Sequence, residues 1–352
     1  MIDLRSDTVT QPCKKMRAYM VSAPVGDDAY GEDESVNLLQ NYCKDLFKVE
    51  DALFVTSGMM ANRLAFLSQT SPGDEVITES SYHVNFFDSA PMAAFAGLVM
   101  NPCTTSDGIL RVKNINEAFI LKQRYDYFAQ PKLISIENSI NGWVGKVFPF
   151  EELKILYKFA QTNKISLHLD GARLFNAHIT TGISLKDYAA QAHTLSVCFS
   201  KGLGAPYGSL LMGNADIINK AKKFRIWLGG GVHQAGMLAA GAYYALNYNL
   251  QRLNEDHKLA QYFAQKLREI PEIKLADSAI ETNMVQFGLH DLILDTNQFL
   301  DECAQRGLYL FPWLPSVARA VIHRHITQEI LDQAISIIKG IILNNKKKVT
   351  CK

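Results

Sequence analysis

The sequence alternates between short apolar, β-branched runs and longer segments with helical spacing of apolar residues, and this alternation constrains the fold more than any other feature. The strand-like runs occupy residues 52–58, 74–80, 132–138, 165–174 and 193–201. The helix-like segments include residues 35–47, 59–69, 151–163 and 214–227. Strands that alternate with helices form a mostly parallel sheet, because each crossover returns the chain to the same edge. We therefore predict an α/β fold in which helices cover both faces of a mostly parallel sheet.

The pattern changes toward the C-terminus, where shorter strands and helices follow one another as in an α+β domain. We expect helices over residues 233–253, 257–269, 296–305 and 327–343, and strands over 282–287 and near Leu308 and Val321. Residues 1–30 mix Pro12, Pro24 and Gly26 with polar side chains and are expected to form an arm rather than a core element. The predicted division is an arm over residues 1–30, a large domain over 31–250 and a small C-terminal domain over 251–352.

The charge balance excludes partners that a strong electrostatic field would recruit. Lysine and arginine number 36 against 35 acidic residues, which gives a formal net charge of +1. No apolar run approaches the roughly 18 residues of a membrane-spanning helix, and the start MIDLRSDTVTQP lacks an apolar targeting segment. The 6 cysteines lie far apart without a CxxC pair, which favours a reducing compartment. We expect a cytoplasmic protein that binds a small molecule, with no nucleic acid or membrane partner.

Lys201 is unusual for its segment, LSVCFSKGLGAPYGSLL (195–211). It ends an apolar, strand-like run and is followed by Gly202, Gly204 and Gly208 rather than by charged residues. A lysine in such surroundings either extends its amine to water at the surface or supplies a cation to a functional site.

Other polar groups also stand at predicted strand ends, where open α/β sheets bind their ligands. Ser57 and Gly58 open a helix, His83 follows a strand, and Asp170 ends another. Pyridoxal phosphate (PLP) requires this combination: an amine for covalent attachment, a carboxylate to keep the pyridine nitrogen protonated, a planar group against the ring, and backbone N–H donors for the phosphate. Taken alone, an aspartate at a strand end or a single histidine more often has a structural role, but the combination favours a PLP site.

Other cofactor classes have weaker support in the sequence. The glycines after Lys201 do not form GxGxxG, and no GxxxxGK[ST] motif occurs, so dinucleotide and P-loop sites are disfavoured. His323 and His325 alternate like residues on one face of a strand, but no carboxylate or thiolate stands near them in the sequence, so we predict no metal site.

The segments that carry these residues resemble the L-threonine aldolase family, PLP enzymes of the aspartate-aminotransferase fold type I. The resemblance runs through most of the chain and is weakest in the C-terminal part. The matching segments are DLRSDTVTQP (3–12), PVGDDAYGEDESVN (24–37), FVTSGMMAN (54–62), ISIENSINGWVG (134–145), LHLDGARLFNA (167–177), FSKGLGAPYGSLLMG (199–213) and RIWLGGGVHQAG (225–236).

The resemblance implies how the cofactor is held. Lys201 would bind PLP covalently, Asp170 would pair with the pyridinium nitrogen, and His83 would stack on the ring. His83, directly or through water, is also our candidate for the base that takes the proton of the substrate's β-hydroxyl. The phosphate would bind to four residues at the helix start and beside the lysine: Ser57, Gly58, Met59 and Ser200.

The resemblance also implies how the substrate is bound. Ser6, Arg173 and Arg319 would bind the substrate carboxylate, and Arg173 would also approach the phenolic oxygen of the cofactor. Tyr30 would contribute from the arm across a subunit interface, and Tyr127 would lie near the β-substituent of the substrate. The family forms its active site between subunits, so a homodimer or homotetramer is expected.

Four positions depart from the usual pattern of the family. Met59 replaces a threonine, and His233 and Ile226 replace an arginine and a lysine that would approach the phosphate, so we expect weaker phosphate binding. Tyr127 replaces a histidine, and a phenol is a poor general base at neutral pH because its pKa is near 10 when unperturbed.

The function implied by the resemblance is that of a PLP-dependent carbon–carbon lyase that cleaves L-threonine or L-allo-threonine to glycine and an aldehyde. One alternative keeps PLP but carries out β-elimination or another carbanion reaction on a related amino acid. A second alternative is a binding or regulatory protein on the same scaffold, and the presence of both Lys201 and Asp170 argues against it.

Overall fold

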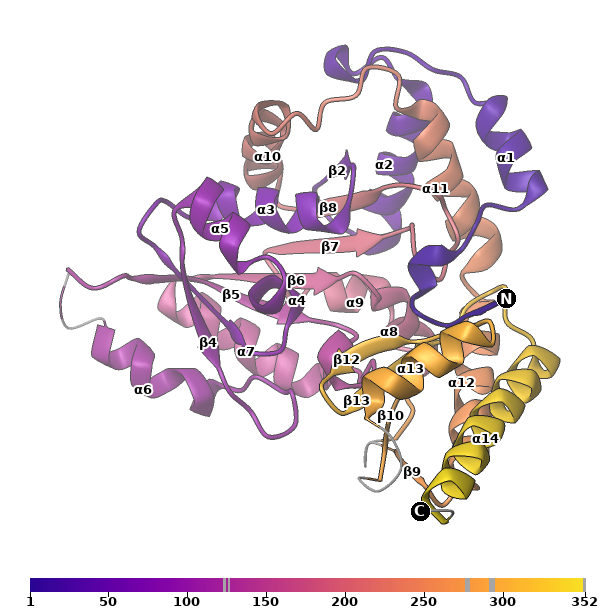
Figure 1. Ribbon diagram of the computed structural model, residues 1–352. Coiled ribbons are helices and arrows are strands. Elements are labelled where there is room, and N and C mark those ends of the chain that lie inside the picture. Colours follow the sequence, from indigo (N-terminus) through magenta and orange to yellow (C-terminus); the bar gives the residue numbers. More distant parts are fainter. Residues whose placement is uncertain (123–124, 126, 276–278, 291–294, 351–352) are drawn as a thin grey trace.

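The computed structural model describes residues 1–122, 125, 127–275, 279–290 and 295–350. In this part of the chain the largest sheet has seven strands in the order β2-β8-β7-β6-β5-β3-β4, flanked by helices (Figure 1). The strands are β2 (Asp51–Val55), β3 (Glu75–Glu79), β4 (Val99–Cys103), β5 (Pro131–Glu137), β6 (Ser166–Gly171), β7 (Thr194–Cys198) and β8 (Ser209–Gly213). The predicted α/β architecture is confirmed.

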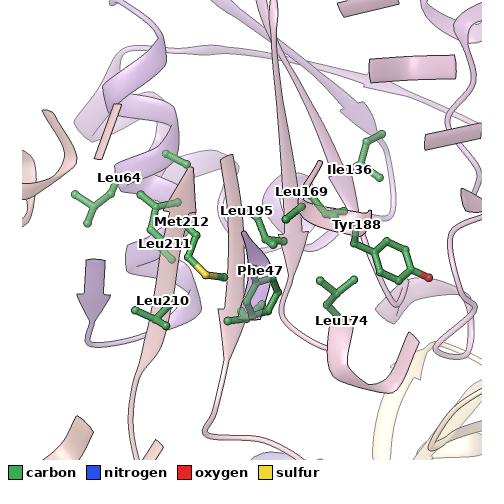
Figure 2. Packing of buried hydrophobic residues seen from close by; sticks show 14 of the residues in the cluster. Phe47, Leu64, Ile136, Leu169, Leu174, Tyr188, Leu195, Leu210, Leu211 and Met212 are labelled. Atoms are coloured by element: carbon green, nitrogen blue, oxygen red, sulfur yellow. The ribbon is translucent and has the colours of Figure 1, made fainter. Parts of the chain in front are cut away.

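Helices cover both faces of this sheet. Every residue of β3 and of β7 is buried, and successive strand side chains point to opposite faces, so both faces must be covered. The helices of this part are α1 (Lys14–Val21), α2 (Glu34–Phe47), α3 (Gly58–Gln69), α4 (His83–Phe86), α5 (Ser89–Ala96), α6 (Val112–Lys122), α7 (Phe150–Asn163), α8 (Leu174–Thr181), α9 (Leu185–Ala189), α10 (Ala215–Trp227) and α11 (Gly236–Asn249). Figure 2 shows aliphatic and aromatic side chains of the resulting core, among them Phe47, Leu169, Leu195 and Met212.

Strand β8 runs against the direction of its neighbours, which the sequence pattern did not indicate. It pairs antiparallel with both β7 and β2, whereas β4, β3, β5, β6 and β7 pair in parallel. The chain from β7 to β8, residues 199–208, is too short to hold a crossover helix, so the strand can only turn back beside β7. Lys201 lies in this turn.

Edge strand β4 was not predicted either. Its residues are half-buried or exposed, and it contains Asn101 and Pro102. Proline and partly solvated side chains are typical of an edge strand and give no apolar run to recognise.

The C-terminal part contains a second, antiparallel sheet in the order β12-β13-β10-β9. Its strands are β9 (Ile273–Leu275), β10 (Met284–Leu289), β12 (Phe311–Leu314) and β13 (Val317–Val321), and its helices are α12 (Leu253–Arg268), α13 (Thr296–Gln305) and α14 (Gln328–Thr350). This is the predicted α+β pattern, with α14 longer than expected and with the long predicted helix over 233–253 ending at Asn249. The Asn249 side chain donates a hydrogen bond to the carbonyl of Leu203 at 2.7 Å, which ties the end of α11 to the turn after Lys201.

The first thirty residues contribute to both hydrophobic cores, so the expectation that they form no core element was wrong. Strand β1 (Ile2–Asp3) pairs in parallel with β11 (Leu308–Tyr309), and Leu4 is buried in the C-terminal core. Met16 of α1 is fully buried in the core of the large sheet. The domain boundaries at residues 30 and 250 stay predictions.

Two histidines beyond β13 hold this N-terminal stretch in place. His323 and His325 lie after the strand rather than in it. The His323 Nε2–H donates to the carbonyl of Asp3 at 2.8 Å, and the His325 Nε2 accepts the N–H of Gln11 at 2.9 Å. Their roles in the structure are therefore to bind backbone.

Two further observations concern the cysteines and the apolar character of the helices. The described cysteines Cys13, Cys43, Cys103, Cys198 and Cys303 are free, and Cys351 lies outside the described residues. Within the described ranges, no helix combines the length and the apolar character needed to cross a membrane.

A substitution at Gly171, at the end of β6, tests how closely β6 and β7 are packed. A Cβ at this position would lie 2.5 Å from the carbonyl oxygen of Ser196 and 3.0 Å from the Cβ of Leu174. We predict that Gly171→Ala lowers the free energy of unfolding by about 1–3 kcal/mol, because the strands must shift apart. Denaturant unfolding measures this.

The control is Gly340→Ala in the interior of α14, where the nearest atom to an added Cβ is Arg306 Nη1 at 3.4 Å. Alanine there should be neutral or stabilising by about 0.5–1 kcal/mol. Equal unfolding free energies for the two variants would show that β6 and β7 are not closely packed at Gly171.

Candidate functional site

One cavity of about 340 Å³ lies beyond the carboxyl ends of the parallel strands. All the residues predicted to hold the cofactor line it, namely Ser57, Gly58, Met59, His83, Asp170, Arg173, Ser200 and Lys201. Ser6 and Arg319, predicted to bind the substrate, line it as well. The side chain of Lys201 therefore lines a cavity and does not extend from an open surface.

Two predicted substrate residues lie elsewhere in this chain. Tyr127 is 79% exposed and contacts Tyr125 and Phe128, with ring centroids 5.4 and 4.7 Å away. Tyr30 is 80% exposed and lines a second cavity of about 540 Å³. Their roles in substrate binding stay predictions.

The departures from the family pattern are divided between the two cavities. Met59 lines the first, whereas Ile226 and His233 line the second together with Tyr30. The His233 Nδ1 lies 3.0 Å from a carboxylate oxygen of Asp27. The expected weakening of phosphate binding stays a prediction.

The carboxylate of Asp170 is fixed by hydrogen bonds on both oxygens. Its Oδ2 accepts from the side-chain amide of Asn62 at 2.7 Å, and its Oδ1 accepts from the N–H of Ala172 at 3.0 Å, with Ser196 Oγ 3.5 Å away. Donors to both oxygens hold the carboxylate aimed in one direction.

A buried polar row behind Asp170 sets the orientation of Asn62. The Asn62 Oδ1 accepts from Ser196 Oγ at 2.9 Å and from His168 Nε2 at 3.0 Å, which leaves its amide N–H for Asp170. His168 Nδ1 lies 2.9 Å from the hydroxyl of Thr194. Burial lowers the pKa of His168 to about 4, so the ring is neutral at neutral pH and keeps one N–H to donate.

The start of α3 offers backbone donors to the cavity. The hydroxyl of Ser57 accepts only the N–H of Met60, at 3.2 Å, so the first two N–H groups of the helix stay without an intrahelical partner. Gly58 is required here, because a Cβ would lie 2.7 Å from the sulfur of Cys198. Free N–H groups at a helix start favour an anion such as phosphate.

The turn that carries Lys201 is held by contacts from three segments. The carbonyl of Lys201 accepts from the hydroxyl of Thr10 at 2.9 Å and from the N–H of Gly204 at 2.8 Å. Gly204 has a φ of +77°, a left-handed conformation that glycine adopts without strain. A Cβ at Gly202 would lie 2.8 Å from Leu253. The backbone is thus fixed while the side chain reaches the cavity.

Arg173 is already paired within the chain. Its Nε and Nη2 donate to the two oxygens of Asp7 at 2.9 and 2.6 Å, and both side chains are buried. Burial alone would raise the pKa of Asp7, but the charge of Arg173 and its hydrogen bonds hold that pKa well below its usual range. The Nη1 of Arg173 does not contact Asp7 and lies 3.5 Å from Asn141 Oδ1.

Arg319 has no carboxylate partner in the described structure and is the better group for an incoming carboxylate. Its Nη1 donates to Asn141 Oδ1 at 2.9 Å, and its buried Nε has no partner among the described residues. Its guanidinium lies 4.6 Å from the ring centroid of Phe311 and 4.8 Å from that of Trp313. Burial, with the neighbouring charge of Arg173, lowers its pKa to about 10, so it stays a cation at neutral pH.

His83 and aromatic side chains line one part of the cavity wall. The His83 ring lies 4.9 Å from that of Phe87, and the Phe87 ring lies 6.3 Å from that of Trp313. Burial lowers the pKa of His83, so its ring is neutral near pH 7 and can accept a proton.

Several residues that build this site were not predicted. They are Asp7, Asn62, Glu137, Asn141, Phe311 and Trp313. The first four lie in segments that resemble the family, so the sequence marked these segments as part of the site but did not reveal the contacts of the four residues. Phe311 and Trp313 lie in the part with the weakest resemblance and gave no signal.

The site fits a PLP-sized group with an anionic end. Ser139 Oγ and Arg319 Nε are buried in the cavity wall without a partner among the described residues. With the donors at the start of α3, the carboxylate of Asp170 and the amine of Lys201, the wall supplies each contact that PLP requires.

Comparisons with known proteins agree on one family. A family model described as β-eliminating lyase matches residues 3–289. A low specificity L-threonine aldolase of Escherichia coli K12 is 43% identical over 270 residues, which cover 76% of this chain and 80% of that protein. Low-specificity L-threonine aldolase 1 of Arabidopsis thaliana is 33% identical over 347 residues, 97% of this chain and 96% of that protein.

A solved structure has the same fold. The structure of Leishmania major threonine aldolase matches with a TM-score of 0.84 at 19% identity, over 97% of this chain and 100% of that chain. At this identity the match supports the fold alone.

The buried pair of Asp7 and Arg173 gives a prediction for stability. Asp7→Asn leaves the Arg173 cation buried without its counter-ion, and we predict a loss of about 3–5 kcal/mol in the free energy of unfolding. Because the pKa of Asp7 is lowered in the folded state, this loss should shrink as the pH falls below the ordinary value of 3.8. Denaturant unfolding at several pH values measures both.

The control is Asp3→Ala, which removes the partly exposed pair with Arg5 in the same stretch. Its cost should be within about 1 kcal/mol. An Asp7→Asn variant as stable as this control would contradict the assignment of Arg173 as a paired, buried cation.

Proposed function

The chain belongs to the β-eliminating lyase family, in which its relatives are low-specificity L-threonine aldolases, and on this premise we propose that it is a PLP-dependent aldolase. Its substrates are L-threonine or L-allo-threonine, which it cleaves to glycine and an aldehyde. The observation that carries the proposal is the meeting of Asp170, Lys201, the start of α3 and Arg319 in one cavity.

We propose a distinct role for each residue of the cavity toward the cofactor. Lys201 binds it covalently, the free N–H groups of Gly58 and Met59 bind its phosphate, and Asp170 holds the proton on its ring nitrogen. Bound there, PLP accepts the electrons of the bond that is broken at the Cα of the substrate. The row from His168 through Asn62 keeps Asp170 in place.

The residues around the substrate decide which bond breaks. Arg319 binds the carboxylate in a planar grip and so fixes rotation about the Cα, which sets the Cα–Cβ bond in the reactive orientation. The neutral His83 takes the proton of the β-hydroxyl as the Cα–Cβ bond breaks and the aldehyde C=O forms. The Cα gains a proton in place of the broken bond, which balances the proton that His83 removed, and glycine is released.

We propose further that the protein is a cytoplasmic homodimer or homotetramer. The exposed positions of Tyr30 and His233, at the second cavity, support a role for this region at a subunit interface. Sedimentation of the purified protein measures its oligomeric state.

A β-eliminating activity is the second candidate, favoured by the description of the matching family model. Both reactions need the same cofactor contacts and differ in the bond to be broken. An assay panel that follows acetaldehyde from L-threonine and L-allo-threonine, and keto acid and ammonia from serine and cysteine analogues, distinguishes them. Keto acid without any aldehyde would overturn the aldolase proposal.

Lys201→Ala should abolish aldehyde release and the visible absorbance of the lysine-bound cofactor while keeping the wild-type circular dichroism, because no other amine in the cavity can form the bond. In the wild type, borohydride reduction and peptide mapping should place the cofactor on residue 201. The control is Lys154→Ala, at an exposed lysine paired with Glu151. Modification of a different residue would refute the assignment of Lys201.

Asp170→Ala should keep the covalently bound cofactor but lower kcat by about 10²-fold or more, since the ring nitrogen loses its proton partner. Steady-state kinetics and the absorbance spectrum report the two effects separately. Asp107→Ala, at a carboxylate held by Arg111 outside the cavity, is the control. Near-normal turnover in Asp170→Ala would rule out its proposed role.

A further inference from the structure

We propose that Glu137 is a positioning residue, whose single carboxylate fixes both His83 and the asparagine that holds Arg319. This inference rests on the proposed function, because it assigns a task to the two groups that act on the substrate. The proposal concerns Glu137 acting through its neighbours and gives it no step in the reaction itself.

Glu137 ends β5 beside Asp170 in the parallel register, and only 4% of its surface is exposed. Its Oε2 accepts the N–H of His83 at 2.6 Å, and its Oε1 accepts the N–H of Asn141 at 2.7 Å. Each oxygen thus holds a different segment of the chain.

Both N–H groups stand at helix starts that lack a cap of their own. His83 opens α4, and Asn141 opens the short 3-10 helix η3 (Asn141–Trp143); neither preceding residue, Tyr82 nor Ile140, caps its helix with a side chain. Such N–H groups need an acceptor when buried. Glu137, from a third element, supplies it to both.

The two capped residues reach opposite parts of the cavity. His83 presents its ring to the cavity directly. Asn141 accepts from Arg319 Nη1 at 2.9 Å through its side-chain oxygen, and Arg173 Nη1 lies 3.5 Å from the same atom. A displacement of Glu137 would therefore move both His83, which takes the β-hydroxyl proton, and the asparagine that holds Arg319, which binds the carboxylate.

The charges that act on Glu137 include those of Asp170, Lys201 and Arg173. Burial, together with the negative charge of Asp170, raises the pKa of Glu137 to about 7, while the two N–H donors and Lys201 favour its ionised form. Burial of the Glu137 carboxylate therefore costs free energy, as expected of a group whose task is to position neighbouring residues.

Replacement by glutamine keeps the size of the side chain but provides only one acceptor oxygen. Its NH₂ group must then face the N–H of either His83 or Asn141, and that segment has to move because two donors cannot pair.

The matched control is Asp33, another buried carboxylate that serves two helix starts. It caps α2 at the N–H of Val36, 3.0 Å away, and accepts the N–H of Gly236 at the start of α11 at 2.8 Å. It does not line the cavity. Asp33→Asn makes the same chemical change at a site without contact to His83 or Asn141.

The experiment compares the full-length holoenzymes Glu137→Gln, Asn141→Ala and Asp33→Asn with wild type. It measures kcat and KM for L-threonine, the dissociation constant of glycine from its spectral change, and Tm.

We expect at least about a tenfold loss of kcat/KM for Glu137→Gln. For Asn141→Ala, which keeps the capped N–H but frees Arg319, we expect a rise in KM and in the glycine dissociation constant with a smaller change in kcat. Asp33→Asn should lower Tm and leave the kinetic constants within about twofold.

Kinetic constants of Glu137→Gln equal to those of Asp33→Asn would overturn the proposal. If Glu137→Gln does not fold, unchanged glycine binding in Asn141→Ala would overturn it. If the wild type cleaves no β-hydroxy amino acid, the proposed function is wrong, and the positioning role of Glu137 needs a test that does not depend on activity. A crystal structure of the Glu137→Gln apoprotein then decides the positioning role: displacement of His83 or of the Asn141–Arg319 contact supports it, and retention of both refutes it.

Discussion

The parallel register of β5, β6 and β7 is the constraint on which the site depends. It sets Glu137 opposite Asp170, and Asp170 opposite Ser196, through backbone hydrogen bonds that need no side-chain contact. Because the strands are covered on both faces, polar groups at their ends are shielded from water and need partners from the protein. The partners found there, Asn62, His83 and Asn141, are the residues that shape the cavity.

Among the described residues, the two arginines at the cavity differ in how their charge is paired. Asp7 neutralises Arg173 in a bidentate pair. In the described part of the chain, Arg319 in contrast contacts neutral groups: the side chain of Asn141, a backbone carbonyl of Arg5 and two aromatic faces. The lowered pKa of Arg319 shows that its charge is held at a cost, and a bound carboxylate would offset that cost.

The sequence allowed the architecture and the centre of the site to be predicted, because both follow from patterns along the chain. Alternating apolar runs predict the strands, and their ends carry Asp170 and Lys201. The direction of β8 depends on the length of one turn, and β4 lacks an apolar signal. The pairing of Asp7 with Arg173 joins residues far apart in the chain, and the positions of Phe311 and Trp313 depend on the packing of β12 against β13, where Phe311 lies opposite Arg319. Such contacts are set by tertiary structure, which local periodicity does not encode.

The position of the N-terminal stretch has a consequence for how the protein matures. Ile2 pairs with Leu308, Asp7 with Arg173, and the hydroxyl of Thr10 with the carbonyl of Lys201. Residues 2, 7 and 10 are synthesised before their partners at 308, 173 and 201 and must wait for them before they reach their final places. Because Arg319 also lines the cavity, the pocket is complete only after residue 319 has been synthesised, and a shorter nascent chain cannot bind coenzyme in its final geometry.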